Sequence, residues 1–154
     1  MFITELEMSK YFEKYLKSNF GNCYLKEHEG LFGIPDFVLY ANDGTNVYII
    51  SFELKLKNWK RAATQAFRYK SFSNSAYVVM EINHATPAIN NLDHFKKFNI
   101  GLAVFDISKG LQIVFQPSAD EPYSNKLNQK LISTIGSSRK RAKNLDVLIS
   151  DAKC

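Results

Sequence analysis

The stretch Val47-Tyr48-Ile49-Ile50-Ser51-Phe52-Glu53-Leu54-Lys55-Leu56 is the strongest strand pattern in the chain and decides the expected fold. Successive side chains of a strand point to opposite faces, and here one face is apolar throughout. The other face begins apolar and ends with Glu53 and Lys55. Apolar residues on both faces at its start predict a central, covered strand. Two charges at its far end cost free energy unless they are paired, hydrated or bound to a metal.

The residues before this strand predict a hairpin that brings a second acid close to it. An apolar run over 36–40 is followed by Asn42-Asp43-Gly44, which is typical of a two-residue turn. With that turn Asp36 lies opposite Ser51, on the same face as Glu53 and diagonal to it. Diagonal neighbours lie about 7–8 Å apart at the backbone. A register shifted by one residue would place Asp36 on the opposite face.

These residue types suit the hydrolysis of a phosphodiester. Asp36 and Glu53, leaning together, can bracket one Mg²⁺ ion, which prefers oxygen ligands and keeps several waters. A metal ion polarises a phosphoryl oxygen and lowers the pKa of a bound water. Lys55 is then expected to orient the attacking water or to offset charge in the transition state.

The rest of the chain predicts a single pattern of alternating helices and strands. The expected elements are a helix over 4–20, a short strand over 23–28, a helix over 58–72, a strand over 76–80, a helix over 86–98, strands over 100–105 and 111–115, and a helix over 125–135. The helix over 58–72 is a crossover, so the strand over 76–80 is expected to run parallel to the strand over 47–56. This order predicts an α/β fold with a mixed sheet.

Ile34-Pro35-Asp36 followed by Glu53-Leu54-Lys55, between a preceding helix and a crossover helix, resembles the PD-(D/E)xK nuclease superfamily. Many restriction endonucleases, archaeal Holliday-junction resolvases and RecB-type nuclease domains share that fold. The resemblance covers the first half of the chain by motif and extends to about Phe115 by element order. It implies a restriction-endonuclease-like α-β-β-β-α-β core and DNA hydrolysis. It also implies that Asp36 and Glu53 hold Mg²⁺, for which Mn²⁺ substitutes, and that Lys55 is catalytic.

Members of the superfamily often add an acid from the first helix, and here Glu5, Glu7 and Glu13 compete for that role. Glu5 borders the inward stripe of the helix and is the predicted third metal ligand. Glu7 is expected to be occupied as the capping-box partner of Thr4. A first-turn acid is also favoured by the helix dipole alone, so a purely structural role for Glu5 stays open.

Some members also carry a glutamine on the helix after the lysine, and Gln65 fits that position. Arg61, Gln65 and Arg68 share one helical face, which is predicted to contact the substrate backbone. A solvated helix face is an equally good interpretation of the same spacing. Trp59 is expected in the core, and Glu81, at a strand end, is a minor candidate for metal or substrate contact.

The composition fits a compact, basic protein of 154 residues with a formal charge of +5, which favours a polyanionic partner such as DNA. Residues 1–116 are the predicted nuclease core, and residues 117–154 a helical extension for dimerisation or DNA docking. The basic run Arg139–Lys143 is either a phosphate clamp or a solvated helix start. No apolar stretch reaches membrane-spanning length, so a cytoplasmic protein without membrane contact is expected.

Two other functions remain open at this point. The same residues would also support an RNA nuclease. A non-catalytic nucleic-acid-binding or regulatory module with this fold is the alternative outside enzymes. A small nuclease without a separate recognition domain is expected to cut by structure, to act as a homodimer, or to depend on a protein partner for targeting.

Overall fold

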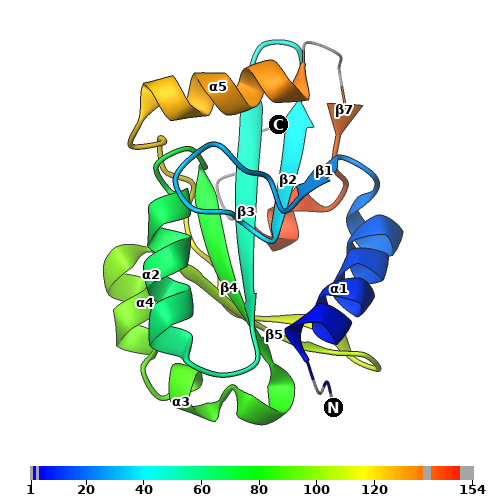
Figure 1. Cartoon of the computed structure of the whole chain (residues 1–154), viewed down its shortest axis with the longest axis vertical. Coiled ribbons are helices and arrows are strands. Elements are labelled where there is room, and N and C mark those ends of the chain that lie inside the picture. Colours follow the sequence, from blue (N-terminus) through cyan, green and yellow to red (C-terminus); the bar gives the residue numbers. More distant parts are fainter. Residues whose placement is uncertain (1, 3, 137–139, 150–154) are drawn as a thin grey trace.

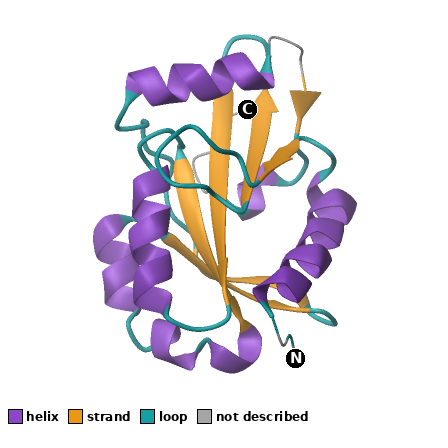
Figure 2. Cartoon of the chain, viewed as in Figure 1, coloured by secondary structure: helices purple, strands orange, loops and turns teal. Residues whose placement is uncertain are grey.

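The chain, described here from a computed structural model, is an α/β fold built on a mixed open sheet flanked by helices (Figures 1 and 2). The structure describes residues 2, 4–136 and 140–149. The elements are α1 Glu5–Phe20, β1 Tyr24–Lys26, β2 Phe37–Asn42, β3 Val47–Lys55, α2 Trp59–Tyr69, β4 Ser75–Glu81, η1 Ile82–His84, α3 Thr86–Ile89, α4 Leu92–Phe98, β5 Gly101–Asp106, β6 Gly110–Phe115, α5 Asn125–Ile135, β7 Lys140–Arg141 and η2 Leu145–Val147.

The sheet order is β1-β2-β3-β4-β5-β6, with β7 added to β2 beside β1. The pairs β3–β4 and β4–β5 are parallel, and the other pairs are antiparallel. The predicted parallel crossover is therefore confirmed, with α2 as its helix. The strand over 47–56 is central as expected, because β2 and β4 cover its two edges.

The predicted two-residue turn between β2 and β3 is wrong. Asn42 pairs with Val47, and residues 43–46 form the loop. The carboxylate of Asp43 accepts hydrogen bonds from the N–H groups of Thr45 and Asn46 at 2.9 and 2.7 Å. Such side-chain acceptors stabilise a longer loop than the Asp-Gly pair alone predicts.

The register of the hairpin therefore differs from the prediction by two residues. Val38, and not Asp36, lies opposite Ser51, and Phe37 lies opposite Phe52. A shift of two residues keeps every side chain on its face, whereas a shift of one would exchange the faces. The correction brings Asp36 closer to Glu53 along the strands and leaves both on the predicted face.

Local signals explain the helix bounds. The Thr4 hydroxyl accepts the N–H of Glu7 at 3.1 Å and starts α1, while Gly21, with φ of 94°, ends it. Asn58 adopts the left-handed conformation and caps α2 by accepting the N–H of Arg61 at 3.3 Å. These helix starts agree with the sequence-based expectation.

The helix predicted over 86–98 is two helices. It divides into α3 and α4 at Asn90 and Asn91, and Asn91 has the non-helical angles φ −117° and ψ 33°. The Asn91 side chain donates to the carbonyl of Pro87 at 2.7 Å. Asparagine side chains compete with the helical backbone for hydrogen bonds, and two in succession end the helix.

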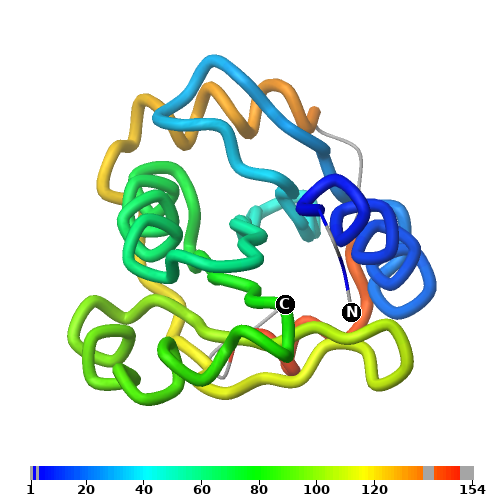
Figure 3. Tube along the Cα trace, turned by 60° about the horizontal axis from the view of Figure 1, so that its bottom comes forward, coloured from blue at the N-terminus to red at the C-terminus, as the bar shows by residue number. Residues whose placement is uncertain are grey.

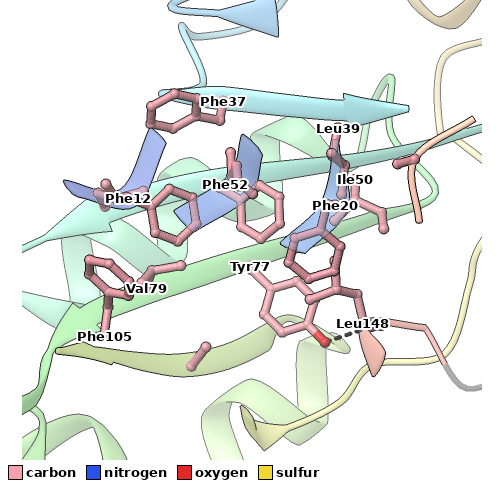
Figure 4. Packing of buried hydrophobic residues seen from close by; sticks show 14 of the residues in the cluster. Phe12, Phe20, Phe37, Leu39, Ile50, Phe52, Tyr77, Val79, Phe105 and Leu148 are labelled. Atoms are coloured by element: carbon pink, nitrogen blue, oxygen red, sulfur yellow. Dashed lines mark hydrogen bonds between the residues drawn. The ribbon is translucent and has the colours of Figure 1, made fainter. Parts of the chain in front are cut away.

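Apolar side chains cover both faces of the sheet and form two cores. On one face α1 buries Met8, Phe12, Leu16 and Phe20 against the aromatic rings of the strands (Figure 4). On the other face α2 buries Ala62, Ala63 and Ala66, whose small side chains let the helix lie close to the sheet. Trp59 is partly buried and packs on this second core as expected.

The segment after β6 packs on the body of the molecule. Leu131 of α5 is buried in the second core, and Leu145, Leu148 and Ile149 are buried in the first. The predicted basic run Arg139–Lys143 contains β7 and is therefore no helix start; Arg139 lies outside the described residues. Among the described helices, none combines the length and apolar character needed to cross a bilayer.

Candidate metal centre

The candidate site lies where β3 ends and β2 begins, between α1 and α2. Figure 3 shows the two helices on opposite sides of this end of the sheet. Glu53 and Lys55 lie beside Val78 and Met80 of β4, both of which belong to the core under α2. Asp36 directly precedes β2, and its backbone N–H donates to the carbonyl of Phe52 at 3.0 Å. The structure thus brings the two predicted acids and the lysine to one place.

Each carboxylate commits one oxygen to the protein. Asp36 Oδ2 accepts the N–H of Leu54 at 2.7 Å, and Glu53 Oε1 lies 2.6 Å from the hydroxyl of Tyr69. Within the described part of the chain, no hydrogen bond occupies Asp36 Oδ1 or Glu53 Oε2. Both side chains are therefore fixed by one oxygen and offer the other to a ligand.

The pKa values of Asp36 and Glu53 are both raised, which shows that their negative charges are not balanced by nearby positive charge. Burial raises the pKa of Asp36 to about 6, and the negative charges of Glu5 and Glu27 add to the effect. Burial also raises the pKa of Glu53 to about 7, with the charge of Asp36 as the next cause. Lys55 opposes both shifts but does not cancel them. A divalent cation between the carboxylates would offset the cost of burying both charges and the repulsion that Asp36 exerts on Glu53.

Tyr69 of α2 holds Glu53 in place. Its hydroxyl lies 2.6 Å from Glu53 Oε1 and 3.0 Å from the carbonyl oxygen of Ile34, yet it carries one proton. When Glu53 is ionised, Tyr69 donates to the carboxylate. When Glu53 is protonated, the acid donates to the Tyr69 oxygen, and Tyr69 donates to Ile34. Burial, followed by the Glu53 hydrogen bond, raises the pKa of Tyr69, so its proton stays in place.

Gly33 allows the loop before Asp36 to approach Tyr69. A Cβ atom at Gly33 would lie 2.9 Å from the Tyr69 ring, and its φ of +78° also favours glycine. The contact fixes the loop that carries Ile34 and Asp36. Sequence reasoning did not find Tyr69; its position four residues after Gln65, on the same helical face, was the available signal.

The three acidic residues of α1 considered from the sequence, Glu5, Glu7 and Glu13, interact with different partners. Glu5 Oε2 lies 3.8 Å from Lys55 Nζ, at the edge of the site, and is half exposed. The backbone N–H of Glu7 bonds Thr4, while Glu13 accepts from Tyr24 at 2.6 Å and from Lys26 at 3.2 Å. Glu5 is thus the first-helix acid whose charge reaches Asp36 and Glu53.

The structure does not gather Glu5 with the other two acids into a ligand set. Across residues 2, 4–136 and 140–149, no group of three or more His, Cys, Asp or Glu side chains is placed to hold a metal ion. The possible protein ligands at the site are therefore the carboxylates of Asp36 and Glu53, and ligation by Glu5 stays a prediction. Such a two-carboxylate donor set, all oxygen and completed by waters, fits Mg²⁺.

The three residues predicted to contact the substrate from α2 lie in different environments. Gln65 lies one turn before Tyr69, and its Oε1 atom is buried with no hydrogen-bond partner in the described structure. Arg61 is exposed, and the Arg68 guanidinium lies 5.5 Å from the centre of the Phe32 ring. An unpaired buried amide oxygen costs free energy, which a metal-bound water or a substrate donor would recover.

Glu81 is already occupied by neighbouring donors. Its carboxylate accepts Asn83 Nδ2 at 2.6 Å and lies 2.7 Å from His84 Nδ1. Burial raises its pKa, but the hydrogen bonds from Asn83 and His84 outweigh that effect and lower the pKa overall. This environment favours a structural role over the metal or substrate contact considered from the sequence.

Comparison with known proteins found no matching family model, no similar curated protein and no similar solved structure. Function is therefore inferred from the residues of this chain.

Proposed function

We propose that the protein is a metal-dependent nuclease that hydrolyses phosphodiester bonds of DNA and has the restriction-endonuclease-like form of the α/β fold. The observation that carries the proposal is the convergence of Asp36, Glu53 and Lys55 at the end of β3. Two buried carboxylates with raised pKa values, each offering one oxygen, form a cation site next to a lysine. The order α1-β1-β2-β3-α2-β4 agrees with the core of the superfamily that the motif resembles.

In this mechanism Asp36 and Glu53 would hold Mg²⁺ or Mn²⁺, while Tyr69 and the Leu54 N–H orient the two carboxylates. A metal ion held there would supply Lewis-acid chemistry. Lys55 orients the attacking water and offsets the negative charge that builds on the phosphoryl oxygens. The attacking water gives up a proton to solvent as it adds to phosphorus, the P–O bond to the leaving sugar oxygen breaks, and that oxygen takes up a proton from solvent.

The charge of the chain and the state of the site support cleavage of a nucleic acid over a non-catalytic binding module. A formal charge of +5 favours a nucleic-acid substrate. A binding module would not need two carboxylates pointed at one place, because they repel phosphate unless a cation lies between them. An RNA substrate is a second outcome of the same assay.

The experiment is a cleavage panel with plasmid, single-stranded DNA, branched DNA and RNA, with Mg²⁺, Mn²⁺ or EDTA. The proposal expects DNA products with either metal and none with EDTA. Asp36→Asn and Glu53→Gln proteins that still unfold in a single cooperative transition should lose the activity. Equal cleavage by these variants, or no cleavage of any nucleic acid with either metal, would contradict the proposal.

A further inference from the structure

An apolar groove of about 350 Å³ lies outside the candidate metal centre, between α2, α4 and the loop before Asp36. Its lining includes Phe32 from the loop, Phe67 and Arg68 from α2, and His94 and Phe98 from α4. The three phenylalanines are 49%, 39% and 36% exposed, respectively. We call this surface the aromatic groove. Large apolar side chains that remain exposed together mark a binding surface.

The rings of the aromatic groove contact one another in sequence. Phe98 lies between His94 and Phe67, with ring centres 4.9 and 5.6 Å away. Beyond them, the Trp59 ring centre lies 5.3 Å from His94, and the Tyr123 ring centre lies 5.8 Å from Phe67. The result is a row of partly exposed rings instead of a single pocket for one small ligand.

Cations accompany the rings. The helix α2 carries Lys60, Arg61 and Arg68 and no acidic residue. The Arg68 guanidinium lies 5.5 Å from the Phe32 ring centre, and Lys97 Nζ lies 5.5 Å from the Phe98 ring centre. Aromatic faces with adjacent cations are the composition that binds single-stranded nucleic acid, where bases stack and phosphates pair. A groove for an apolar protein segment would have no need of these cations.

The aromatic groove and the candidate metal centre share the same helix and loop. Arg68 contacts Phe32, while the next residue, Tyr69, contacts Glu53. The loop continues from Phe32 through Gly33, which packs on Tyr69, to Asp36. The aromatic groove and the carboxylates are therefore joined through α2 and the loop that carries Phe32 and Asp36.

We propose that the aromatic groove binds unstacked bases of a single-stranded DNA segment, so that the substrate is single-stranded or branched DNA. The faces of bases in a continuous duplex are stacked on their neighbours and are not accessible to Phe67 or Phe98. The part of this inference that concerns cleavage rests on the proposed nuclease function. The part that concerns binding does not.

The test measures fluorescence anisotropy of the full chain with labelled oligothymidine, a forked duplex and a blunt duplex, all in EDTA to prevent cleavage. The variants Phe67→Leu and Phe98→Leu keep an apolar side chain and remove the stacking ring. Tyr11→Leu is the matched control, since Tyr11 is equally exposed but lies on α1. We expect each groove variant to weaken binding of oligothymidine about tenfold and the control to leave it unchanged.

Wild-type protein that binds blunt duplex as tightly as oligothymidine would overturn the inference. So would groove variants that keep wild-type affinity. A wild-type dimer that becomes monomeric in both groove variants, with unchanged affinity for oligothymidine, would assign the aromatic groove to a contact between copies and would also overturn it.

The two proposals fail in different ways. Strand binding through the aromatic groove without cleavage in Mg²⁺ or Mn²⁺ would contradict the nuclease function and support the inference. Equal cleavage of duplex and single strands by wild type and both groove variants would contradict the inference alone.

Discussion

Glu53 and Glu81 lie near the ends of adjacent parallel strands, both almost fully buried, yet their environments differ. Glu81 accepts from Asn83 and interacts with His84, and its pKa is lowered. Glu53 has one hydroxyl partner and faces the charge of Asp36, and its pKa is raised to about 7. Glu81 has two side-chain partners, whereas Glu53 has one donor and a neighbouring carboxylate, and these differences separate the two pKa values. The protein satisfies Glu81 by itself and leaves Glu53 in need of a cation.

The largest difference between the two glutamates is expected in cleavage. Glu53→Gln and Asp36→Asn should each lower the rate on the order of a thousandfold, because each removes a proposed metal ligand. Glu81→Gln should keep the rate within a few-fold of wild type. Initial rates at a Mg²⁺ concentration that saturates the wild type, with melting curves to confirm folding, measure both effects. A Glu81→Gln protein as inactive as the Glu53→Gln protein would contradict the claim that only Glu53 takes part in cleavage.

Lys55 is expected to contribute less than the two acids. Lys55→Met keeps the length of the side chain and removes its charge, so the rate should fall about a hundredfold while metal binding persists. Lys57→Met, on the exposed residue beyond the strand, is the control. Loss of Mg²⁺ binding in the Lys55→Met protein would give the lysine a structural role instead.

Replacing Glu53 and replacing Glu81 by glutamine should change the free energy of unfolding in opposite directions. Because folding raises the pKa values of Asp36 and Glu53, the native state binds more protons than the unfolded state between about pH 4 and pH 7. Stability without metal therefore falls as pH rises through that window and stays low above it. At pH 8 Glu53→Gln should stabilise the metal-free protein by about 1–3 kcal/mol, whereas Glu81→Gln should destabilise it by about 1 kcal/mol.

Urea unfolding with EDTA at pH 8 gives these free energies. Added Mg²⁺ should stabilise the wild type and not the Glu53→Gln protein, since a ligand of the native state raises stability by mass action. Destabilisation by Glu53→Gln in EDTA would show that the carboxylate is satisfied as Glu81 is.

The smallest predicted effect concerns Tyr69. Tyr69→Phe leaves Glu53 without its hydroxyl partner, so the carboxylate loses orientation and the apparent affinity for Mg²⁺ should fall about fivefold. The rate at saturating Mg²⁺ should remain near wild type, because Tyr69 acts through Glu53 and does not touch the reacting atoms. A fall in the saturated rate with unchanged metal affinity would contradict this positioning role.

The sequence predicted the elements best where a periodic pattern and a cap coincide. Strand β3, the cap at Thr4 and the parallel crossover follow from local patterns. The register of the β2–β3 hairpin was not predicted correctly, because the Asp43 carboxylate stabilises a longer loop than the pair Asp43-Gly44 suggests. A register shift of two residues leaves every side chain on its predicted face of the sheet, so Asp36 still lies on the same face as Glu53.

Interactions between distant segments were the least predictable part of the site. Tyr69 reaches Glu53 and Ile34 from α2, and its spacing from Gln65 marks the helical face but does not identify these two partners. The same limit applies to the aromatic groove, which combines residues from α2, α4 and a loop. Only the packing of the helices brings these side chains together.

Calorimetric titration of the metal-free protein with Mg²⁺ at pH 8 and at pH 6 tests the central claim most directly. The account predicts binding in the wild type that weakens as pH falls below about 7, with proton release, and that is lost in the Asp36→Asn and Glu53→Gln proteins. Mg²⁺ binding that is independent of pH, or unchanged in both variants, would contradict it.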